Sequence, residues 1–421
     1  MKRVLMVTSH YPPDGDSSGV LRTLKFSKYL PRYKWIPHVL TFKEWLYKVK
    51  DYGLAGDIPP EAKVYRTFAL DGARHLAIRG RHLALLTVPD RFVAWLPFGI
   101  IRGFCIIRKR GIHALYSTSP IPTTHLIAFV LKAFTGLPWA ADFRDPWIEE
   151  GIHPRPGTLR YRVEATLERL VIRRADRLIV TTPDLGRDLL NRYPELMPEK
   201  IQTIYNGYDE GDFENMDLIA PGKLFEIIHA GLVTPEFRDP FPLLREIAFL
   251  IADGDLSEGD IRVTFLGGGS YVASNKFAAA VKQLGLVRVV QVIDRVSHQE
   301  ALQHLKQAAV LLLLQASDDT RSLIPAKTFE YLRIGRPILA LTLEGATAHL
   351  LKGMNHCYVV DPGDQSSLRS SVLSLYRQWQ HSPPEGSSVS RPIWMYERAN
   401  LTAEIAQLLD KMVAETPVAH S

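Results

Sequence analysis

The chain has 421 residues, which predicts two to three domains of ~150 residues each, and its hydrophobic content of 46% and charged content of 23% are ordinary for a globular protein. Its two cysteines, Cys105 and Cys357, lie far apart in apolar surroundings. This pattern argues against a disulfide framework or a cysteine metal site, and it predicts reduced, buried thiols in a cytosolic protein.

The net charge of +6 conceals an asymmetry between the two halves of the chain. Residues 1–205 hold 32 lysines and arginines against 19 aspartates and glutamates, a balance of +13. Residues 206–421 hold 19 against 26, a balance of −7. A basic first half predicts an anionic partner, such as a membrane surface, a phosphorylated acceptor or nucleic acid.

Neither a leader peptide nor a membrane-spanning helix is expected. The apolar run Val4–Val7 is too short for a signal peptide. The run around Gly99–Ile107 is interrupted by Arg102 and falls short of the ~20 apolar residues that a membrane span needs.

The chain opens with a predicted strand, loop and helix. Lys2–Thr8 is an apolar, β-branched run, and the turn-rich loop YPPDGDSSG leads to Gly19, after which a partly apolar pattern predicts a helix. Such a turn can receive a phosphate, although it lacks the G-x-G-x-x-G spacing. Asp14 and Asp16 form an Asp-x-Asp pair, which fits turn chemistry better than a divalent metal site.

Further short apolar runs in the first half alternate with helical patterns. This alternation predicts an α/β fold with a doubly wound parallel sheet, in which ligands bind at the carboxyl ends of the strands. The predicted strands begin near His38, Val64, His113, Trp139, Arg177 and Gln202, and the clearest helical patterns cover 124–134 and 160–174.

Residues 74–110 interleave basic and apolar side chains. Two interpretations remain open: an interfacial surface for a membrane, or a helix that packs its apolar side on the sheet and exposes its arginines. The basic residues are Arg74, Arg79, Arg81, Arg102, Arg108, Lys109 and Arg110, and the apolar ones include Trp95, Phe98, Ile101 and Phe104.

The segment DFRDPW follows a predicted strand and therefore projects from its carboxyl end. It places Arg144 between Asp142 and Asp145, and these three are the candidate catalytic residues. An arginine is permanently charged and cannot act as a general base, but it can orient an acceptor or a phosphate. Alternatively, the two carboxylates clamp Arg144 and shape the loop.

The turn at Asn206-Gly207 marks the predicted change of domain, and a second α/β domain then begins near Leu224. The predicted boundaries are 1–205 for the first domain, 206–222 for a linker, 223–390 for the second domain and 391–421 for a closing helix. The closing helix is expected from about Tyr396 to Val413.

The most informative stretch is IPAKTFEYLRIGRPILAL, from Ile324 to Leu341. Lys327 and Glu330 stand three residues apart at the start of a short amphipathic helix, so both side chains leave nearly the same face. Gly335 ends this helix, and the apolar run after Pro337 reads as a buried parallel strand. A carboxylate can bind ribose hydroxyls, while an ammonium and a helix N-terminus favour a diphosphate.

This segment, with DFRDPW and NGYD, resembles family 4 glycosyltransferases. The resemblance implies a GT-B fold: two Rossmann-like domains facing a cleft, with a C-terminal helix that crosses back to the first domain. It also implies transfer of a sugar, with retained configuration, from a nucleoside-diphosphate sugar to a glycan or polyprenyl-diphosphate-linked acceptor. A cytoplasmic enzyme of cell-surface polysaccharide synthesis, peripheral at the inner membrane face, is expected.

The resemblance also implies residue roles. Glu330 would bind the donor ribose, and Lys327 and Arg238 its diphosphate. Val296 would lie near the base, and the first-loop glycines, Gly15 and Gly19, would allow close approach of donor and acceptor. Fixed cations would stabilise the departing diphosphate, so no metal or other cofactor is expected.

Three positions depart from the family pattern. Arg144 replaces a common histidine near the donor sugar, Leu232 replaces an arginine, and Ser322 stands where a first glutamate is usual. Ser322 and Arg144 keep one alternative open, a non-catalytic nucleotide-sugar-binding partner. A nucleotide-sugar epimerase or hydrolase on the same fold is a second alternative. Nucleic acid is not expected, because no compact recognition motif is visible.

Overall fold

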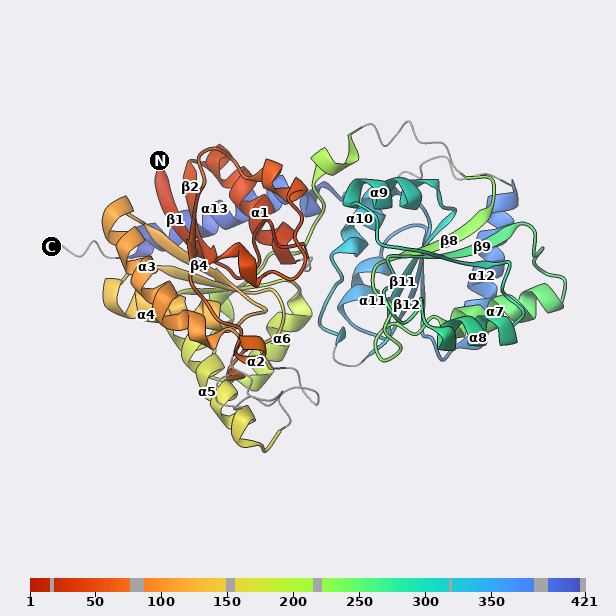
Figure 1. Ribbon diagram of the computed structural model, residues 1–421, viewed down its shortest axis with the longest axis horizontal. Coiled ribbons are helices and arrows are strands. Elements are labelled where there is room, and N and C mark those ends of the chain that lie inside the picture. The colour runs from red at the N-terminus through yellow and green to blue at the C-terminus, as the bar shows by residue number, and fades with distance from the viewer. Residues whose placement is uncertain are drawn as a thin grey trace. The chain divides into compact units, whose positions relative to one another are not determined.

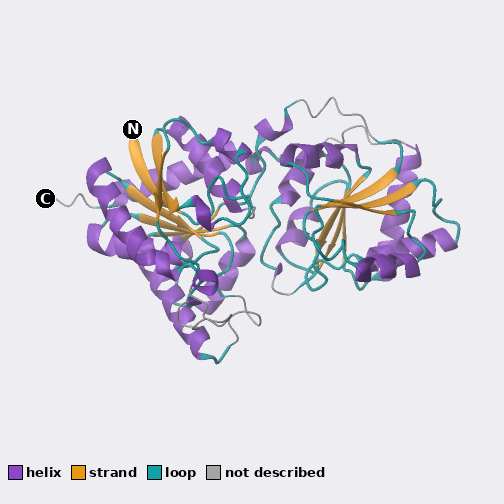
Figure 2. Cartoon of the chain, viewed as in Figure 1, coloured by secondary structure: helices purple, strands orange, loops and turns teal. Residues whose placement is uncertain are grey.

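The computed structural model describes residues 1–15, 19–75, 87–148, 156–214, 222–317, 320–381 and 393–416. The chain forms two compact units, Met1–Asn206 with Arg398–Ser421 and Gly207–Glu397. Figure 2 shows strands gathered in the middle of each unit, with helices outside them. Of the residues singled out above, Asp16, Arg79 and Arg81 lie outside the described ranges.

The first unit contains a seven-stranded parallel sheet in the order β3-β2-β1-β4-β5-β6-β7. Figure 1 labels β1, β2 and β4 of this sheet. Its strands are β1 (Lys2–Val7), β2 (Trp35–Phe42), β3 (Lys63–Thr67), β4 (Ala114–Thr118), β5 (Trp139–Phe143), β6 (Arg177–Val180) and β7 (Ile201–Thr203). Its helices are α1 (Gly19–Tyr29), α2 (Gly72–His75), α3 (Leu96–Arg110), α4 (Thr123–Thr135), α5 (Leu159–Arg174), α6 (Pro183–Arg192) and α13 (Arg398–Glu415).

Apolar side chains bury both faces of this sheet. On β1, Val4 and Met6 join a core cluster with α1 and α13, whereas the alternate residues Leu5 and Val7 are equally buried and point to the other face. The C-terminal helix α13 thus packs on the first unit, as the predicted fold class requires.

Two glycines let α3 lie close to α4. A Cβ at Gly103 would stand 2.6 Å from Leu131 Cδ1, and one at Gly99 would also collide with the next helix. The face of α3 that packs on the protein is therefore set by Gly99, Gly103 and Ile106, and Cys105 falls on the opposite side, where it is exposed. The prediction that this thiol is buried was wrong, because the buried residues of α3 are Gly99, Gly103 and Ile106 on its other face, and apolar neighbours such as Ile101 are exposed with Cys105.

The second unit contains a six-stranded parallel sheet in the order β10-β9-β8-β11-β12-β13. Its strands are β8 (Phe225–Ala230), β9 (Ile261–Leu266), β10 (Val290–Ile293), β11 (Val310–Gln315), β12 (Ile338–Thr342) and β13 (Cys357–Val360). Its helices are α7 (Phe241–Ala252), α8 (Asn275–Gln283), α9 (His298–Gln307), α10 (Lys327–Ile334), α11 (Ala346–Leu351) and α12 (Gln365–His381).

The predicted helix, glycine stop and core strand are present in this unit. Gly335 adopts a left-handed conformation with φ of 76°, and its N–H donates to the Tyr331 carbonyl, which ends α10. Strand β12 follows and is buried throughout between β11 and β13. Two doubly wound parallel sheets confirm the predicted α/β class. Among the described residues, no helix is both long enough and apolar enough to cross a membrane.

Candidate functional site

The second unit brings the end of β8 and the start of α10 together. Lys327 is the first residue of α10, and its Nζ donates to the Ala230 carbonyl at 2.7 Å and lies 3.2 Å from His229 Nε2. Tyr331, one turn later, accepts a hydrogen bond from the Ala230 N–H at 3.2 Å. These contacts fix the first turn of α10 at the carboxyl end of a central strand, where parallel α/β sheets bind ligands.

The residue after β8 must be small. Gly231 has φ of 110°, a conformation that side chains rarely adopt, and a Cβ added to it would lie 3.2 Å from Lys327 Nζ. The glycine therefore leaves room for the ammonium beside the backbone.

The electrostatics of this region favour an anion. Burial first and the nearby Arg238 guanidinium second lower the pKa of Lys327, Glu330 opposes both effects, and the resulting pKa is about 7. Burial also lowers the pKa of Arg238, whose Nη1 donates to the Leu232 carbonyl at 3.2 Å. Two cations and one carboxylate thus share one region, and an added anion would stabilise the charged form of Lys327.

Glu330 is half-buried and faces a histidine that the sequence reasoning did not select. Its Oε1 lies 3.7 Å from His298 Nε2, and the same nitrogen lies 3.7 Å from Asp212 Oδ2. His298 begins α9, and Val296 lies half-buried in the loop just before it. The structure therefore brings Lys327, Glu330 and Arg238 together. Val296 lies two residues before His298, which contacts Glu330.

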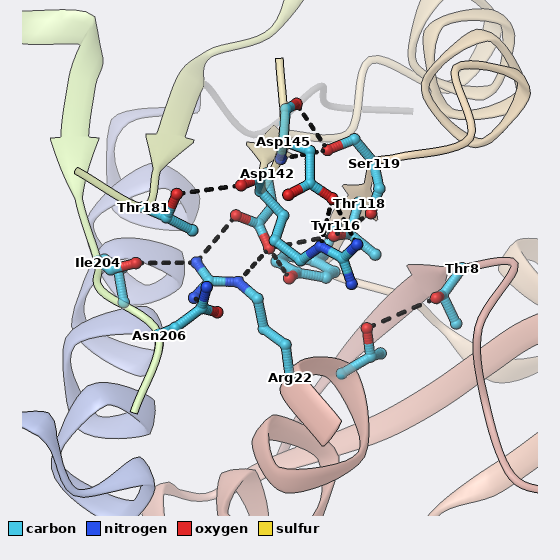
Figure 3. A network of polar contacts seen from close by, with 12 residues as sticks. Thr8, Arg22, Tyr116, Thr118, Ser119, Asp142, Asp145, Thr181, Ile204 and Asn206 are labelled. Atoms are coloured by element: carbon cyan, nitrogen blue, oxygen red, sulfur yellow. Dashed lines mark hydrogen bonds and ion pairs between the residues drawn. The ribbon is translucent and has the colours of Figure 1, made fainter. Parts of the chain in front are cut away.

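In the first unit, Asp142 is the centre of a buried network of polar contacts (Figure 3). Arg22 reaches its carboxylate from α1 with two hydrogen bonds, of 2.8 and 2.9 Å, and both side chains are almost fully buried. Tyr116 and Thr118 donate to the same carboxylate from β4. Arg22 also donates to the carbonyl of Ile204, so the network joins α1, β4, β5 and the end of β7.

Arg144 lies beside this network and is paired with its neighbour. Its Nε donates to Asp145 Oδ2 at 2.8 Å, and Thr181 donates to its carbonyl at 3.0 Å. The Asp145 N–H donates to Ser119 Oγ at 3.0 Å. Of the two carboxylates considered as a clamp on Arg144, Asp145 holds it, whereas Asp142 binds Arg22, a residue that the sequence reasoning missed.

The first loop is held by its own contacts. Gly15 donates to the Val49 carbonyl, and a Cβ on it would lie 3.0 Å from the Asp51 backbone nitrogen. Gly19 is buried at the start of α1. Asp14 Oδ2 lies 2.7 Å from His10 Nδ1. Close packing explains the glycine at position 15, while its role toward a donor stays a prediction.

Residues 59–207 match the family model described as "Glycosyl transferase 4-like domain". The resemblance to family 4 glycosyltransferases is therefore confirmed. The glycosyl transferase 4-like match covers most of the first unit and includes Asp142, Arg144 and Asp145. No curated protein sequence matches the chain.

Solved structures share the fold over nearly the whole chain. A glycosyltransferase from Rickettsia africae is 13% identical, with a TM-score of 0.66, and the match covers 98% of this chain and 99% of that one. Anabaena Alr3699/HepE in complex with UDP-glucose is 13% identical, with a TM-score of 0.60 and 99% coverage of both chains. The UDP-GlcNAc 2-epimerase from Methanocaldococcus jannaschii is 11% identical, with a TM-score of 0.57, covering 98% and 100%. These matches confirm the GT-B fold.

Proposed function

We propose that this protein is a glycosyltransferase that takes a sugar from a nucleoside-diphosphate sugar and passes it to a glycan or lipid-linked glycan. The observation that carries the proposal is the convergence of Lys327, Arg238 and Glu330 at the carboxyl end of β8. Anabaena HepE, which shares the fold, was solved with UDP-glucose, and this supports a nucleotide sugar as the donor.

Each donor-site residue has a separate task in this proposal. Lys327 and Arg238 bind the diphosphate, and Glu330 accepts hydrogen bonds from the ribose hydroxyls. Val296 lies near the base. During transfer, negative charge grows on the departing diphosphate, and fixed cations stabilise that charge in place of a metal ion. The family resemblance supports retention of anomeric configuration, with the acceptor attacking on the face that the diphosphate leaves.

The first unit binds the acceptor in this proposal. Arg144 keeps a permanent charge and orients an acceptor hydroxyl or phosphate, and Asp145 holds the Arg144 guanidinium in place. Asp142 is saturated with donors, so we assign it the task of holding Arg22 and β4 rather than proton transfer. Gly15 and Gly19 keep the first loop close to the sheet.

A second function on the same fold is epimerisation or hydrolysis of the nucleotide sugar, which the likeness to a UDP-GlcNAc 2-epimerase favours. Product analysis separates the two. A transferase consumes the nucleotide sugar only with an acceptor, such as a lipid-linked glycan fraction of the host membrane. Conversion of the sugar without any acceptor would replace the transferase proposal. Tight donor binding with no turnover in either condition would instead support a non-catalytic binding partner, the alternative motivated by Ser322 and Arg144.

We also propose that the first unit contacts an anionic membrane, where a lipid-linked acceptor resides. The outer face of α3 exposes side chains at helical spacing, and residues 92–141 contain no aspartate or glutamate. This α3 face consists of Phe98, Ile101, Arg102, Cys105, Arg108 and Lys109. Basic residues with exposed aromatic and aliphatic ones suit the headgroup region of an anionic bilayer.

Exposed aromatic side chains from other segments, Phe68, Trp45 and Phe134, add apolar surface next to the α3 face. Phe98 packs edge-on against Phe68 with ring centroids 5.1 Å apart, and Phe68 contacts the exposed Trp45. On α4, Phe134 is 78% exposed and packs against Phe104. These rings form an apolar border beside the arginines.

Vesicle sedimentation tests the membrane contact. Wild type should bind vesicles that contain anionic lipid at low salt and release them at high salt, and Ile101→Glu should weaken this binding at least about tenfold, since it replaces an inserted apolar group with a charge. Phe249→Glu, at a residue of α7 that is 60% exposed, is the matched control and should bind as wild type does. Equal binding to neutral and anionic vesicles would remove the proposal.

A further inference from the structure

The donor site contains a buried histidine that none of the roles above uses. His229 is the fifth residue of β8 and is fully buried. Its Nδ1 lies 2.9 Å from the Leu312 carbonyl on the neighbouring strand β11. A carbonyl oxygen can only accept, so Nδ1 carries the proton of the ring. In the neutral ring Nε2 is then an acceptor, and it faces Lys327 Nζ at 3.2 Å.

The charge state of this histidine follows from its surroundings. Burial lowers the pKa of His229 well below its ordinary value, and the Lys327 ammonium lowers it further. The imidazole is therefore neutral near pH 7 and offers its Nε2 lone pair to the ammonium. Protonation would place two cations 3.2 Å apart, one of them on a fully buried ring.

The Lys327 ammonium has three N–H groups, and the protein engages two of them. One N–H faces His229 Nε2 and another donates to the Ala230 carbonyl at 2.7 Å. The Ala230 peptide is itself held, because its N–H donates to the Tyr331 hydroxyl. Among the described residues no third acceptor contacts Nζ, so one N–H remains for a ligand.

We infer that His229, together with the Ala230 carbonyl, positions the Lys327 ammonium so that its remaining N–H meets the diphosphate of the donor. This inference rests on the proposed function, because it assigns His229 a task within that donor site. His229 is a positioning residue: it acts through Lys327 and does not touch the ligand.

The arrangement makes diphosphate binding depend on pH. The groups that act on Lys327 are the Arg238 guanidinium from the loop after β8, Glu330 on its own helix, and the neutral His229 on β8. With a pKa of about 7, Lys327 is partly deprotonated in the empty site at pH 7.5, and a bound diphosphate restores its proton. Above pH 7, affinity should fall roughly tenfold per pH unit, with the uptake of about one proton on binding.

Titration calorimetry of the full chain tests the inference. The probe is whichever of UDP, GDP and ADP binds wild type most tightly. It is titrated at pH 7.5 and at pH 9, because its terminal phosphate is ionised at both pH values. Each titration is made in two buffers of different ionisation enthalpy, so that the number of protons taken up on binding can be measured. Wild type should take up roughly three-quarters of a proton at pH 7.5 and nearly one at pH 9, as a group with a pKa of about 7 requires.

Two substitutions at position 229 isolate the role of its acceptor. His229→Leu removes Nε2, and it should weaken diphosphate binding about tenfold or more, because the ammonium loses a partner. The same loss should lower the pKa of Lys327 in the empty site and so bring proton uptake at pH 7.5 closer to one. His229→Gln keeps an acceptor near Nε2 and should lie closer to wild type in both measurements. His125→Leu is the matched control, since His125 is also fully buried but contacts Ser117 in the first unit. It should lower stability and leave diphosphate binding unchanged.

The outcomes separate this inference from the proposed function. If the diphosphate binds wild type and is lost in Lys327→Ala, but His229→Leu binds with unchanged affinity and proton uptake, the role of His229 is refuted and the donor site stands. If His229→Gln is as weak as His229→Leu while both keep the stability of wild type, the acceptor role is likewise refuted. If none of the three diphosphates binds wild type, the donor site itself fails.

Discussion

Replacing Arg22 should damage the first unit more than any exposed charge does. Its guanidinium makes two hydrogen bonds to Asp142 and also donates to the carbonyls of Ile204 and Tyr205, and both charged side chains are almost fully buried. Within the described part of the chain, Arg22→Met would leave the Asp142 carboxylate with the side-chain donors from β4, Tyr116 and Thr118. Removing one partner of a buried ion pair costs about 3–5 kcal/mol, and we expect the lower end because these two donors remain.

Thermal and denaturant unfolding of the full chain measure this effect. For a unit of this size, ~3 kcal/mol corresponds to a fall of roughly 6–12 °C in the midpoint of the first unit's transition. Arg187→Met is the control, because Arg187 pairs with Asp184 at the surface with 61% of its side chain exposed, and its loss should cost at most about 0.5 kcal/mol. If Arg22→Met has the same free energy of unfolding as Arg187→Met, the network around Asp142 does not stabilise the packing of α1 on the sheet.

Three further predictions concern packing and reactivity. Gly231→Ala should cost about 1–2 kcal/mol in the free energy of unfolding, because φ is 110° at this position. It should also weaken diphosphate binding, because the added Cβ would lie 3.2 Å from Lys327 Nζ. Equal stability of the variant and wild type in denaturant titration would contradict the backbone argument. Gly103→Val should overpack Leu131 and cost about 1–3 kcal/mol, which thermal unfolding would detect, whereas an unchanged midpoint would mean that α3 moves freely from α4. Cys105 is exposed and should react with a thiol reagent in the native protein. Burial raises the pKa of Cys357 to about 12, so Cys357 should react only on unfolding. Mass spectrometry of the labelled peptides would show the order of reaction.

Much of the fold followed from local patterns. The alternation of short apolar runs with helical patterns predicted the parallel sheet of the first half, and the family resemblance implied a second. The Gly335 stop with its following strand predicted the end of α10, because a left-handed glycine and a buried run are both local signals. Position on a helix face was harder to predict. Cys105 was expected inside because its sequence neighbours are apolar, but Gly99 and Gly103 decide which side of α3 packs on α4.

The candidate site was predicted unevenly for a similar reason. Lys327 and Glu330 could be paired from their spacing on one helix. His229 and Arg22 could not, since each acts through a partner far away in the chain: His229 through Lys327, 98 residues away, and Arg22 through Asp142, 120 residues away. A histidine near the end of the strand LFEIIHA and an arginine one turn into the helix after Gly19 were the signals available. Neither pattern specifies a partner.

The most direct test of the donor site is nucleotide binding by calorimetry, with UDP, GDP and ADP and their sugar conjugates titrated into wild type, Lys327→Ala and Glu330→Ala. Lys282→Ala, at an exposed lysine of α8, is the control. We expect one base to be preferred, affinity to fall about tenfold or more in both site variants, and Lys282→Ala to bind as wild type does. Absence of nucleotide binding, or normal binding by both site variants, would contradict the assignment of this region as the donor site.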